Sequence, residues 1–348
     1  MNMTEPQVAS DSTRLADHTT FRIGGPAGSL IVATSESELI AAVQEADQSG
    51  SDLLILSGGS NMLVSDQGFP GVVLKVAIQG IATTRTPTGI RLRVAAGQSW
   101  DDLVATSVTQ GWSGFEMLSG IPGLVGAGPI QNIGAYGVEI ASLIHQVNSY
   151  DRQTNTKVAF SPEQCGFGYR TSLFKQSPNR YVILSVEYDL MIDSVSRPIQ
   201  YTDLAQHLGV NIGTRAKLTA VREAVLEVRR SKGMVLDPAD HDTWSAGSFF
   251  TNPIINETQA DQLPTDAPRY LQPDGSIKTS AAWLIEQAGF NKGYGTGPAR
   301  LSTKHVLALT NHGGATAKDI LDLATTIQVK VRNTYGITLT PEPVLVGL

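Results

Sequence analysis

Short apolar and polar segments divide the first part of this chain into predicted strands and helices. Leu30–Ala33 and Leu53–Leu56 are apolar runs typical of strands. Between them, Ser35 and Glu38 have the spacing of a helix capping box, and the apolar residues that follow recur at helical intervals. Another strand is predicted at Val72–Val76. Strand, helix and strand in this order indicate a small, partly parallel sheet.

The pattern changes at about residue 78. Ile90–Val94 alternates strictly between apolar and polar residues, as a half-exposed strand does. Ser99 is placed to cap a short helix that ends by Gly111, and Arg180–Met191 is a long strand candidate. These elements predict a second α+β subdomain.

The C-terminal third is expected to form another unit with both helices and strands. Helices are predicted at Val221–Ser231, Ala281–Ala288 and Thr316–Tyr335, and strands at Val306–Thr310 and Ile337–Val346. The resulting division has a frayed tail, two subdomains, a connection and a C-terminal domain, at residues 1–16, 17–77, 78–195, 196–220 and 221–348.

Composition narrows the class of protein. Of the 348 residues, 17% are charged and 41% hydrophobic, which is typical of a folded globular chain. The formal net charge of −6 argues against a nucleic-acid surface. Neither a signal peptide nor a membrane-length apolar run is present, so a cytoplasmic protein without membrane contact is expected, with the monomer favoured. Cys165 is the sole cysteine, which excludes a disulfide and predicts a small core residue.

The most informative segment is residues 119–137. It contains six glycines and two prolines but no charged residue. Glycine lets backbone N–H groups approach a ligand closely, and a run of such amides can bind an anion without lysine or arginine. A tight structural connection between strands would explain the same composition. A second glycine-rich loop, Ser57–Asn61, follows a predicted strand, and the pair suggests a long phosphate-bearing ligand.

The familiar nucleotide motifs are absent. Residues 120–128 have the spacing G-x-x-G-x-x-G-x-G rather than G-x-G-x-x-G, and the chain has no G-x-x-x-x-G-K-[ST]. A dinucleotide held by another fold remains possible.

Three residues are candidates for the chemistry. Arg170 follows Tyr169 in a turn-like setting and could bind a carboxylate or an enolate, although a surface ion pair is the ordinary alternative. Ser248 lies in a Gly-Ser turn that lacks the G-x-S-x-G pattern of hydrolases. Glu342 lies between two prolines, which suits a fixed catalytic carboxylate or an edge-strand residue. The segment 240–242 could bind a metal in principle but has no matching partner, so no metal is expected.

Seven segments together resemble the UDP-N-acetylenolpyruvoylglucosamine reductase family. They follow the family's order, and the resemblance runs from about residue 18 to the C-terminus. The segments are Thr20–Gly25, Ser57–Asn61, Gly120–Gly123, Pro129–Gly137, Phe167–Arg170, Ala246–Phe250 and Pro341–Glu342.

The resemblance implies an α+β fold. In it, a two-subdomain FAD-binding module of the vanillyl-alcohol-oxidase type precedes a C-terminal α+β substrate-binding domain. It also implies NADPH-dependent reduction of the enolpyruvyl group of the nucleotide sugar through FAD, a step of peptidoglycan precursor synthesis. The small-molecule substrate and NADPH are then the expected partners. Ser60 stands where relatives with covalent flavin often carry histidine, so FAD should be non-covalent.

Site roles follow from the same resemblance. Arg170 and Glu342 match the family's catalytic arginine and glutamate, and Ser248 matches its proton donor. Substrate binding is implied for Tyr169, Tyr201, Lys232 and Asn252, and for Tyr270, which resembles a lid tyrosine of the longer subtype. Cofactor binding is implied for Ser57, Gly58, Gly59, Ser60, Asn61, Met62, Gly120, Ile121, Gly123, Gly126, Ala127, Gly128, Gln131, Asn132, Gly134, Tyr136 and Gly137.

Two alternatives remain at this point. Another flavin oxidase or dehydrogenase would keep the FAD loops but would not need Arg170, Ser248 and Glu342 together. A nucleotide-sugar-binding regulator without turnover would keep Lys232 and Tyr201 and would need no redox cofactor.

Overall fold

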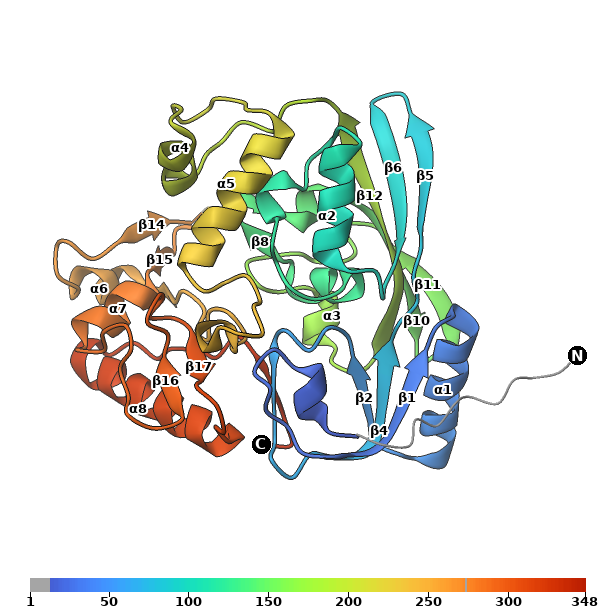
Figure 1. Ribbon diagram of the computed structural model, residues 1–348, viewed down its shortest axis with the longest axis horizontal. Coiled ribbons are helices and arrows are strands. Elements are labelled where there is room, and N and C mark those ends of the chain that lie inside the picture. Colours follow the sequence, from blue (N-terminus) through green and yellow to red (C-terminus); the bar gives the residue numbers. More distant parts are fainter. Residues whose placement is uncertain (1–12, 273) are drawn as a thin grey trace, which may run out of the picture. The chain divides into compact units, whose positions relative to one another are not determined.

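The computed structural model describes residues 13–272 and 274–348, which form two compact units (Figure 1). The first unit comprises Ala27–Gly58 and Pro70–Ser231, together with Thr13 among the described residues. The second comprises Arg14–Pro26, Gly59–Phe69 and Lys232–Leu348. The Arg14–Pro26 segment of the second unit therefore precedes most of the first unit in sequence.

The first unit begins with a three-stranded sheet. Its order is β1-β4-β2, with β1 at Ala27–Ala33, β2 at Leu53–Leu56 and β4 at Phe69–Val76. Strands β2 and β4 are parallel, which confirms the partly parallel sheet. Helix α1 (Glu36–Ser49) connects β1 to β2. The Ser35 side chain accepts a hydrogen bond from the Glu38 N–H, as predicted, although the Glu38 carboxylate reaches back to Thr34.

A larger antiparallel sheet follows in the same unit. Its order is β11-β10-β12-β6-β5, and β7 pairs with β12. The strands are β5 (Ile81–Thr86), β6 (Gly89–Ala95), β7 (Trp112–Ser113), β10 (Ile144–Asp151), β11 (Thr156–Phe160) and β12 (Tyr181–Ile192). The predicted strands at residues 90–94 and 180–191 are thus confirmed.

Helices and short elements complete this unit. The helices are α2 (Trp100–Thr109), α3 (Leu173–Gln176), α4 (Thr202–Leu208) and α5 (Leu218–Ser231). The 3-10 turns are η2 (Glu116–Leu118), η3 (Val125–Gln131) and η4 (Ile140–Ser142), and the hairpin is β8 (Gly134–Ala135) with β9 (Val138–Glu139). Helix α4 lies in the segment expected to be a plain connection. Leu204 and Ala205 explain it, because both are buried against α5.

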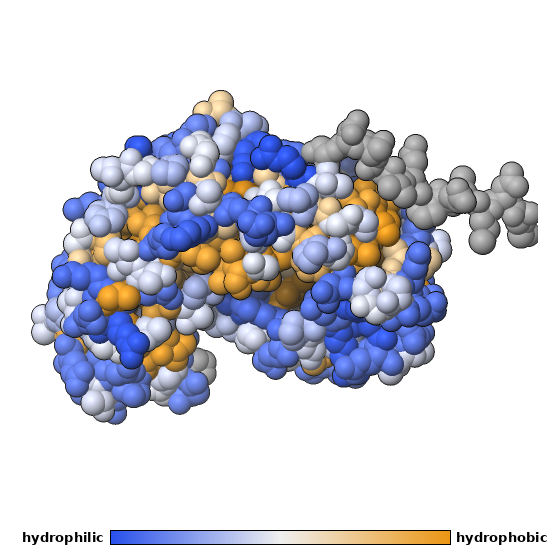
Figure 2. Space-filling view, turned by 90° about the horizontal axis from the view of Figure 1, so that it is seen from below, coloured by the Kyte–Doolittle hydropathy of each residue, from blue (hydrophilic) through white to orange (hydrophobic). Residues whose placement is uncertain are grey.

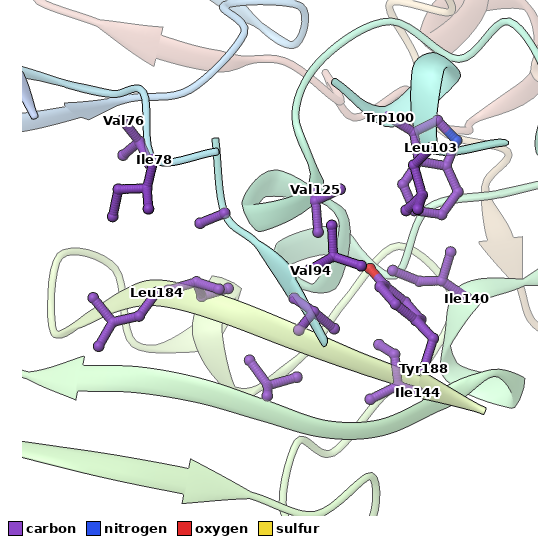
Figure 3. Close-up of a cluster of buried hydrophobic side chains, with 14 of the residues drawn as sticks. Val76, Ile78, Val94, Trp100, Leu103, Val125, Ile140, Ile144, Leu184 and Tyr188 are labelled. Carbon is purple, nitrogen blue, oxygen red and sulfur yellow. The ribbon is translucent and has the colours of Figure 1, made fainter. Parts of the chain in front are cut away.

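The core of the first unit holds the glycine-rich segment in place. Figure 3 shows Trp100 and Leu103 of α2 and Val125 of that segment in one cluster with Leu184 and Tyr188 of β12. The rings of Trp100 and Tyr188 meet edge to face, with centroids 6.2 Å apart. The Trp100 indole also donates to the Leu118 carbonyl at 3.0 Å, directly before the segment. Cys165 is fully buried, as predicted.

The second unit is built on short sheets and three helices. Its helices are α6 (Glu257–Asp261), α7 (Ala281–Gln287) and α8 (Ala317–Tyr335), with 3-10 turns η1 (Leu15–His18) and η5 (His241–Thr243). Its strands are β3 (Met62–Val64), β13 (Ile254–Ile255), β14 (Arg269–Leu271), β15 (Ile277–Thr279), β16 (Ala299–Leu301), β17 (Leu309–Asn311) and β18 (Val344–Val346). Two antiparallel sheets, β13-β15-β14 and β16-β17, and the parallel pair β18-β3 result.

Some sequence boundaries differ from the structure. The strand predicted over 337–346 is present only at Val344–Val346, because Pro341 and Pro343 lack the N–H groups that a continuous ladder needs. The strand predicted at 306–310 is observed at 309–311. Most of the predicted tail lies outside the described residues, but Leu15 and Ala16 are buried in η1. The predicted domain boundaries remain predictions, and the one at residue 221 would separate α5 from the elements on which it packs.

Surface residues are mixed in character. Figure 2 shows hydrophobic residues exposed among hydrophilic ones on one face of the molecule. Tyr270 and Leu271 in β14 are 53% and 78% exposed. Within the described ranges, no helix combines the length and hydrophobicity that crossing a membrane requires.

Candidate functional site

Two loops of the first unit approach each other closely. A β-carbon added to Gly58 would lie 2.6 Å from the Gly123 Cα, so only glycine allows this packing. The backbone N–H groups of Gly58, Ile121 and Gly123 have no acceptor among the residues that the structure describes. The Ser57 hydroxyl is also buried without a partner there. A buried hydroxyl without a partner is costly unless a ligand bonds to it, and the three amides beside it are open to the same ligand, so the loops fit a pyrophosphate.

Other donors of the glycine-rich segment are already used. Gly120 N–H donates to the Asp101 carboxylate at 2.6 Å, and Gly126 N–H donates to the Ala96 carbonyl at 2.9 Å. The Asn132 side chain donates to Glu139 and to the Gly168 carbonyl, and its oxygen accepts from Ala141 N–H. These contacts shape the segment and leave a smaller set of amides for a ligand.

Arg170 lies against the same segment. Its guanidinium donates to the Gly134 carbonyl at 3.0 Å and to the Asn132 carbonyl at 3.5 Å, and it lies 5.8 Å from the centre of the Tyr169 ring. The structure thus joins Phe167–Arg170 to residues 132–134 within one unit. Tyr169 is 37% exposed, so a small molecule can reach it.

Backbone strain gathers at this position. Asn132, Tyr136 and Arg170 have φ values of 47°, 51° and 53°, in the left-handed region that side-chain-bearing residues rarely adopt. Such strain persists only where the surroundings impose it, and it is enriched at ligand sites. All three residues were site candidates from the sequence.

The sequence candidates Tyr136 and Tyr201 also meet in this unit. Their rings are edge to face with centroids 5.3 Å apart, and Tyr201 is 41% exposed directly before α4. Arg229 of α5 lies close to the Tyr136 phenol and interacts with it electrostatically. Sequence analysis missed Asp101, Arg222 and Arg229, although the seven-residue spacing of the two arginines places them on one helix face.

In the second unit, Ser248 and Glu342 belong to adjoining backbone segments. Glu342 N–H donates to the carbonyl of Phe249, the residue after Ser248, at 2.8 Å. Phe250 forms a bridge with Pro341, and Thr251 N–H donates to the Thr340 carbonyl. Residues 94 positions apart in the chain are therefore held side by side.

The second glycine loop continues into this unit beside Glu342. The Asn61 side chain donates to the Glu342 carbonyl at 3.3 Å, and Met62 begins β3, which pairs in parallel with β18. The Ser60 carbonyl accepts from the Thr20 hydroxyl at 3.4 Å. A β-carbon on Gly59 would lie 1.8 Å from the His18 carbonyl oxygen, so glycine is required at this position.

The remaining substrate candidates also lie in the second unit. The Asn252 side-chain oxygen accepts from Ala281 N–H at the start of α7. Burial, together with the positive charges of Lys232 and Lys292, lowers the pKa of His305 to about 4. Lys232 is thus close to a neutral histidine. Asp240 pairs with Lys304, and Asp242 accepts from Thr303, so these carboxylates serve internal contacts.

Comparison with known proteins identifies both parts of the chain. Residues 27–154 match the model of an FAD-binding domain, and residues 237–346 match that of the UDP-N-acetylenolpyruvoylglucosamine reductase C-terminal domain. The reductase of Cutibacterium acnes is 52% identical over 337 residues, which cover 96% of this chain and 89% of that protein. The chain belongs to the UDP-N-acetylenolpyruvoylglucosamine reductase family.

Further relatives agree with this membership. The reductase of Streptomyces avermitilis is 52% identical, with 96% of this chain and 94% of that protein covered. The crystal structure of the reductase from Thermus caldophilus superposes with a TM-score of 0.66 at 26% identity, covering 96% of this chain and 97% of that one. This member of the reductase family is therefore an FAD-containing oxidoreductase, and the predicted α+β fold with an FAD-binding module is confirmed.

Proposed function

We propose that this protein reduces the enolpyruvyl group of UDP-N-acetylenolpyruvoylglucosamine to UDP-N-acetylmuramate, with NADPH as reductant. The observation that carries the proposal is the backbone pairing of the segments that contain Ser248 and Glu342, because it holds two candidate catalytic residues on adjoining segments in a chain of this family. The reaction supplies a peptidoglycan precursor. Its UDP-linked substrate and NADPH both place it in the cytoplasm.

The cofactor site has the donors that its proposed ligand needs. When bound, non-covalent FAD would supply the hydride-transfer chemistry between NADPH and the enolpyruvyl group. Ser57, Gly58, Ile121 and Gly123 would hold its pyrophosphate, since their orphaned donors face no acceptor in the described part of the chain. The absence of cations in residues 119–137 is consistent with amide-based binding.

Arg170, Glu342 and Ser248 have separate roles in this proposal. Hydride addition to the terminal methylene makes the substrate's adjacent carbon and carboxylate enolate-like. The Arg170 guanidinium and Glu342 would steady this charge distribution, which is the effect that most lowers such barriers. The Ser248 hydroxyl would then deliver its proton to the adjacent carbon, which is basic enough to take a proton from a weak acid.

The family resemblance assigns substrate binding to several further residues. Lys232 and Asn252 would bind the diphosphate and neighbouring groups, and Tyr169 and Tyr201 would contact the nucleotide sugar. Tyr270, exposed in β14, would act as a lid that excludes water.

The test of this function follows the colour of the flavin. NADPH added without oxygen should bleach the purified yellow protein, and the enolpyruvyl nucleotide sugar should restore the colour in one turnover. A protein that stays colourless with added FAD, or a bleached flavin that the substrate leaves reduced, would disprove the proposal.

Ser248→Ala separates the two half-reactions. Bleaching by NADPH should stay within about twofold of the unchanged protein, whereas reoxidation by substrate should slow by about 10²–10⁴-fold, the usual contribution of a positioned proton donor. Stopped-flow absorbance measures both rates. Ser276→Ala, which removes an exposed hydroxyl bonded to Asp274, is the matched control and should change neither. Equal slowing of both half-reactions in Ser248→Ala would remove serine from the proton-donor role.

A further inference from the structure

The first end of the glycine-rich segment is tied to helix α5. Arg222 forms two hydrogen bonds with the Asp101 carboxylate, at 2.7 and 2.8 Å. The same carboxylate accepts from Gly120 N–H at 2.6 Å. Burial alone would raise the pKa of Asp101, but the hydrogen bonds from Arg222 and Gly120 lower it, so the carboxylate is charged at neutral pH.

The second end is tied to the same helix two turns later. Arg229 lies close enough to the phenol of Tyr136, next to the last glycine of the segment, to interact with it electrostatically. Its Nε is shielded from solvent, and burial lowers the pKa of the guanidinium, while Tyr136 and Asp101 favour its charged form. A cation in such surroundings is costly to bury, which makes its contacts specific.

Arg222 and Arg229 are seven residues apart, so they lie on the same face of α5. Figure 1 shows α5 beside α2, whose first turn carries Asp101. Arg222 reaches the glycine segment through Asp101 of α2, whereas Arg229 faces Tyr136 of the segment itself. Val221, Ala224, Val225 and Val228 anchor the helix in its own core, so the two arginines extend from a fixed support.

We propose that α5 is a positioning element for the cofactor loop. Arg222 acts through Asp101 on Gly120, and Arg229 acts on Tyr136, so both ends of residues 120–136 are fixed at once. The inference rests on the proposed FAD contacts of this segment. The glycines alone leave the backbone many conformations, and ordering them on binding would weaken affinity. The two arginines remove that freedom before the cofactor arrives.

The experiment measures how fast FAD leaves the loaded protein. Flavin-loaded Arg222→Met and Arg229→Met are diluted, and released FAD is followed by its fluorescence. Each should release FAD about tenfold faster than the unchanged protein. In the double variant the two increases in release rate should multiply, because the two arginines act at different ends of the glycine-rich segment. Tyr136→Phe should match Arg229→Met, and combining these two should add nothing, because they break one contact.

Arg230→Met is the matched control. Arg230 is the exposed neighbour on the same helix, and its loss should leave the release rate within twofold. The visible spectrum of bound flavin and the melting temperature are recorded for every variant. Removing one partner of a charge pair can destabilise a fold, so each variant must melt well above the assay temperature before its release rate is compared. Should Arg229→Met fail to fold, Arg229→Lys retains the charge without the planar fork and should release FAD at an intermediate rate.

Several outcomes would overturn the proposal. It fails if the single variants release FAD within twofold of the unchanged protein, including when only their melting temperatures fall. It also fails if the effects of Tyr136→Phe and Arg229→Met on the release rate multiply, since Arg229 would then act through a contact other than Tyr136. FAD release needs no turnover, so a failure of the proposed reaction would leave this measurement intact.

Discussion

At the scale of single residues, the candidate cofactor-binding residues differ in whether their polar groups already have partners within the protein. The Ser57 hydroxyl and the nearby amides of Gly58 and Gly123 have no acceptor in the ranges described, in a chain of an FAD-dependent family. Asn132 differs, because its side-chain amide already forms hydrogen bonds with Glu139 and with Ala141 N–H. The first group therefore fits cofactor binding better than Asn132 does, although the sequence suggested both.

Tyr188 offers a residue-scale prediction about stability. Its hydroxyl is buried in the aromatic cluster without a hydrogen-bond partner within residues 13–272 and 274–348. An unmade buried hydrogen bond costs about 1–3 kcal/mol. Tyr188→Phe should therefore raise the free energy of unfolding by about 1 kcal/mol, measured by urea denaturation.

Tyr150→Phe is the matched control for that prediction. The Tyr150 hydroxyl accepts from Gln44 at 2.9 Å and donates to Asn155 at 3.0 Å. Its removal should lower the free energy of unfolding by about 1 kcal/mol. An equal loss of unfolding free energy in both variants would show that the Tyr188 hydroxyl has a hydrogen-bond partner in solution.

At the scale of elements, helix ends depend on residues far away in sequence. The Asp66 carboxylate accepts from Ala317 N–H with both oxygens at 3.0 Å, at the start of α8. Thr316 and Asp319 complete a capping box there. A negative charge at a helix N-terminus is also stabilised by the positive end of the helix dipole. Residues 59–69 and the last long helix are thus joined within the second unit.

Asp66→Ala should lower the free energy of unfolding by about 1–2 kcal/mol, because it removes both a cap and a favourable charge. Chemical denaturation measures this loss. Asp322→Ala on the same helix is the control. Its carboxylate is 63% exposed and pairs only with Lys318 among the described contacts, so the change should stay within about 0.5 kcal/mol. Losses of similar size in both variants would contradict a capping role.

At the scale of the whole molecule, acid should weaken the fold through groups that cannot take up protons while buried. Burial holds the pKa of His305 at about 4, whereas the ordinary value is 6.5. The unfolded chain therefore binds a proton before the folded one does. The histidine contributes stability above pH 6.5, and that contribution is lost as pH falls from 6.5 towards 4.

His305→Gln should flatten this part of the stability curve. Urea denaturation between pH 7.5 and 4 should show wild-type stability falling by up to about 3 kcal/mol more than that of the variant, from 1.36 kcal/mol for each unit of pKa shift. Carboxylates such as Asp101 lose their contribution to stability at lower pH than His305 does. Both proteins contain them, so they do not affect the difference between the two curves. Parallel curves for the two proteins would show that His305 is accessible to protons in the folded state.

The sequence by itself determined the local elements and the family chemistry. Apolar periodicity and caps predicted α1, α8 and the main strands. Motif order singled out Arg170, Ser248 and Glu342 as candidate catalytic residues, and these roles stay predictions. Local patterns succeed here because caps, helix faces and strand alternation depend on neighbouring residues.

Only the tertiary structure decided which distant segments meet. It joined Phe249 to Glu342 and Arg170 to Gly134, and it assigned α5 to the glycine-rich segment through Asp101 and Tyr136. It also showed that Pro341 and Pro343 break the last predicted strand. Such pairings depend on long-range packing and on burial of charge, which no local pattern of residues encodes.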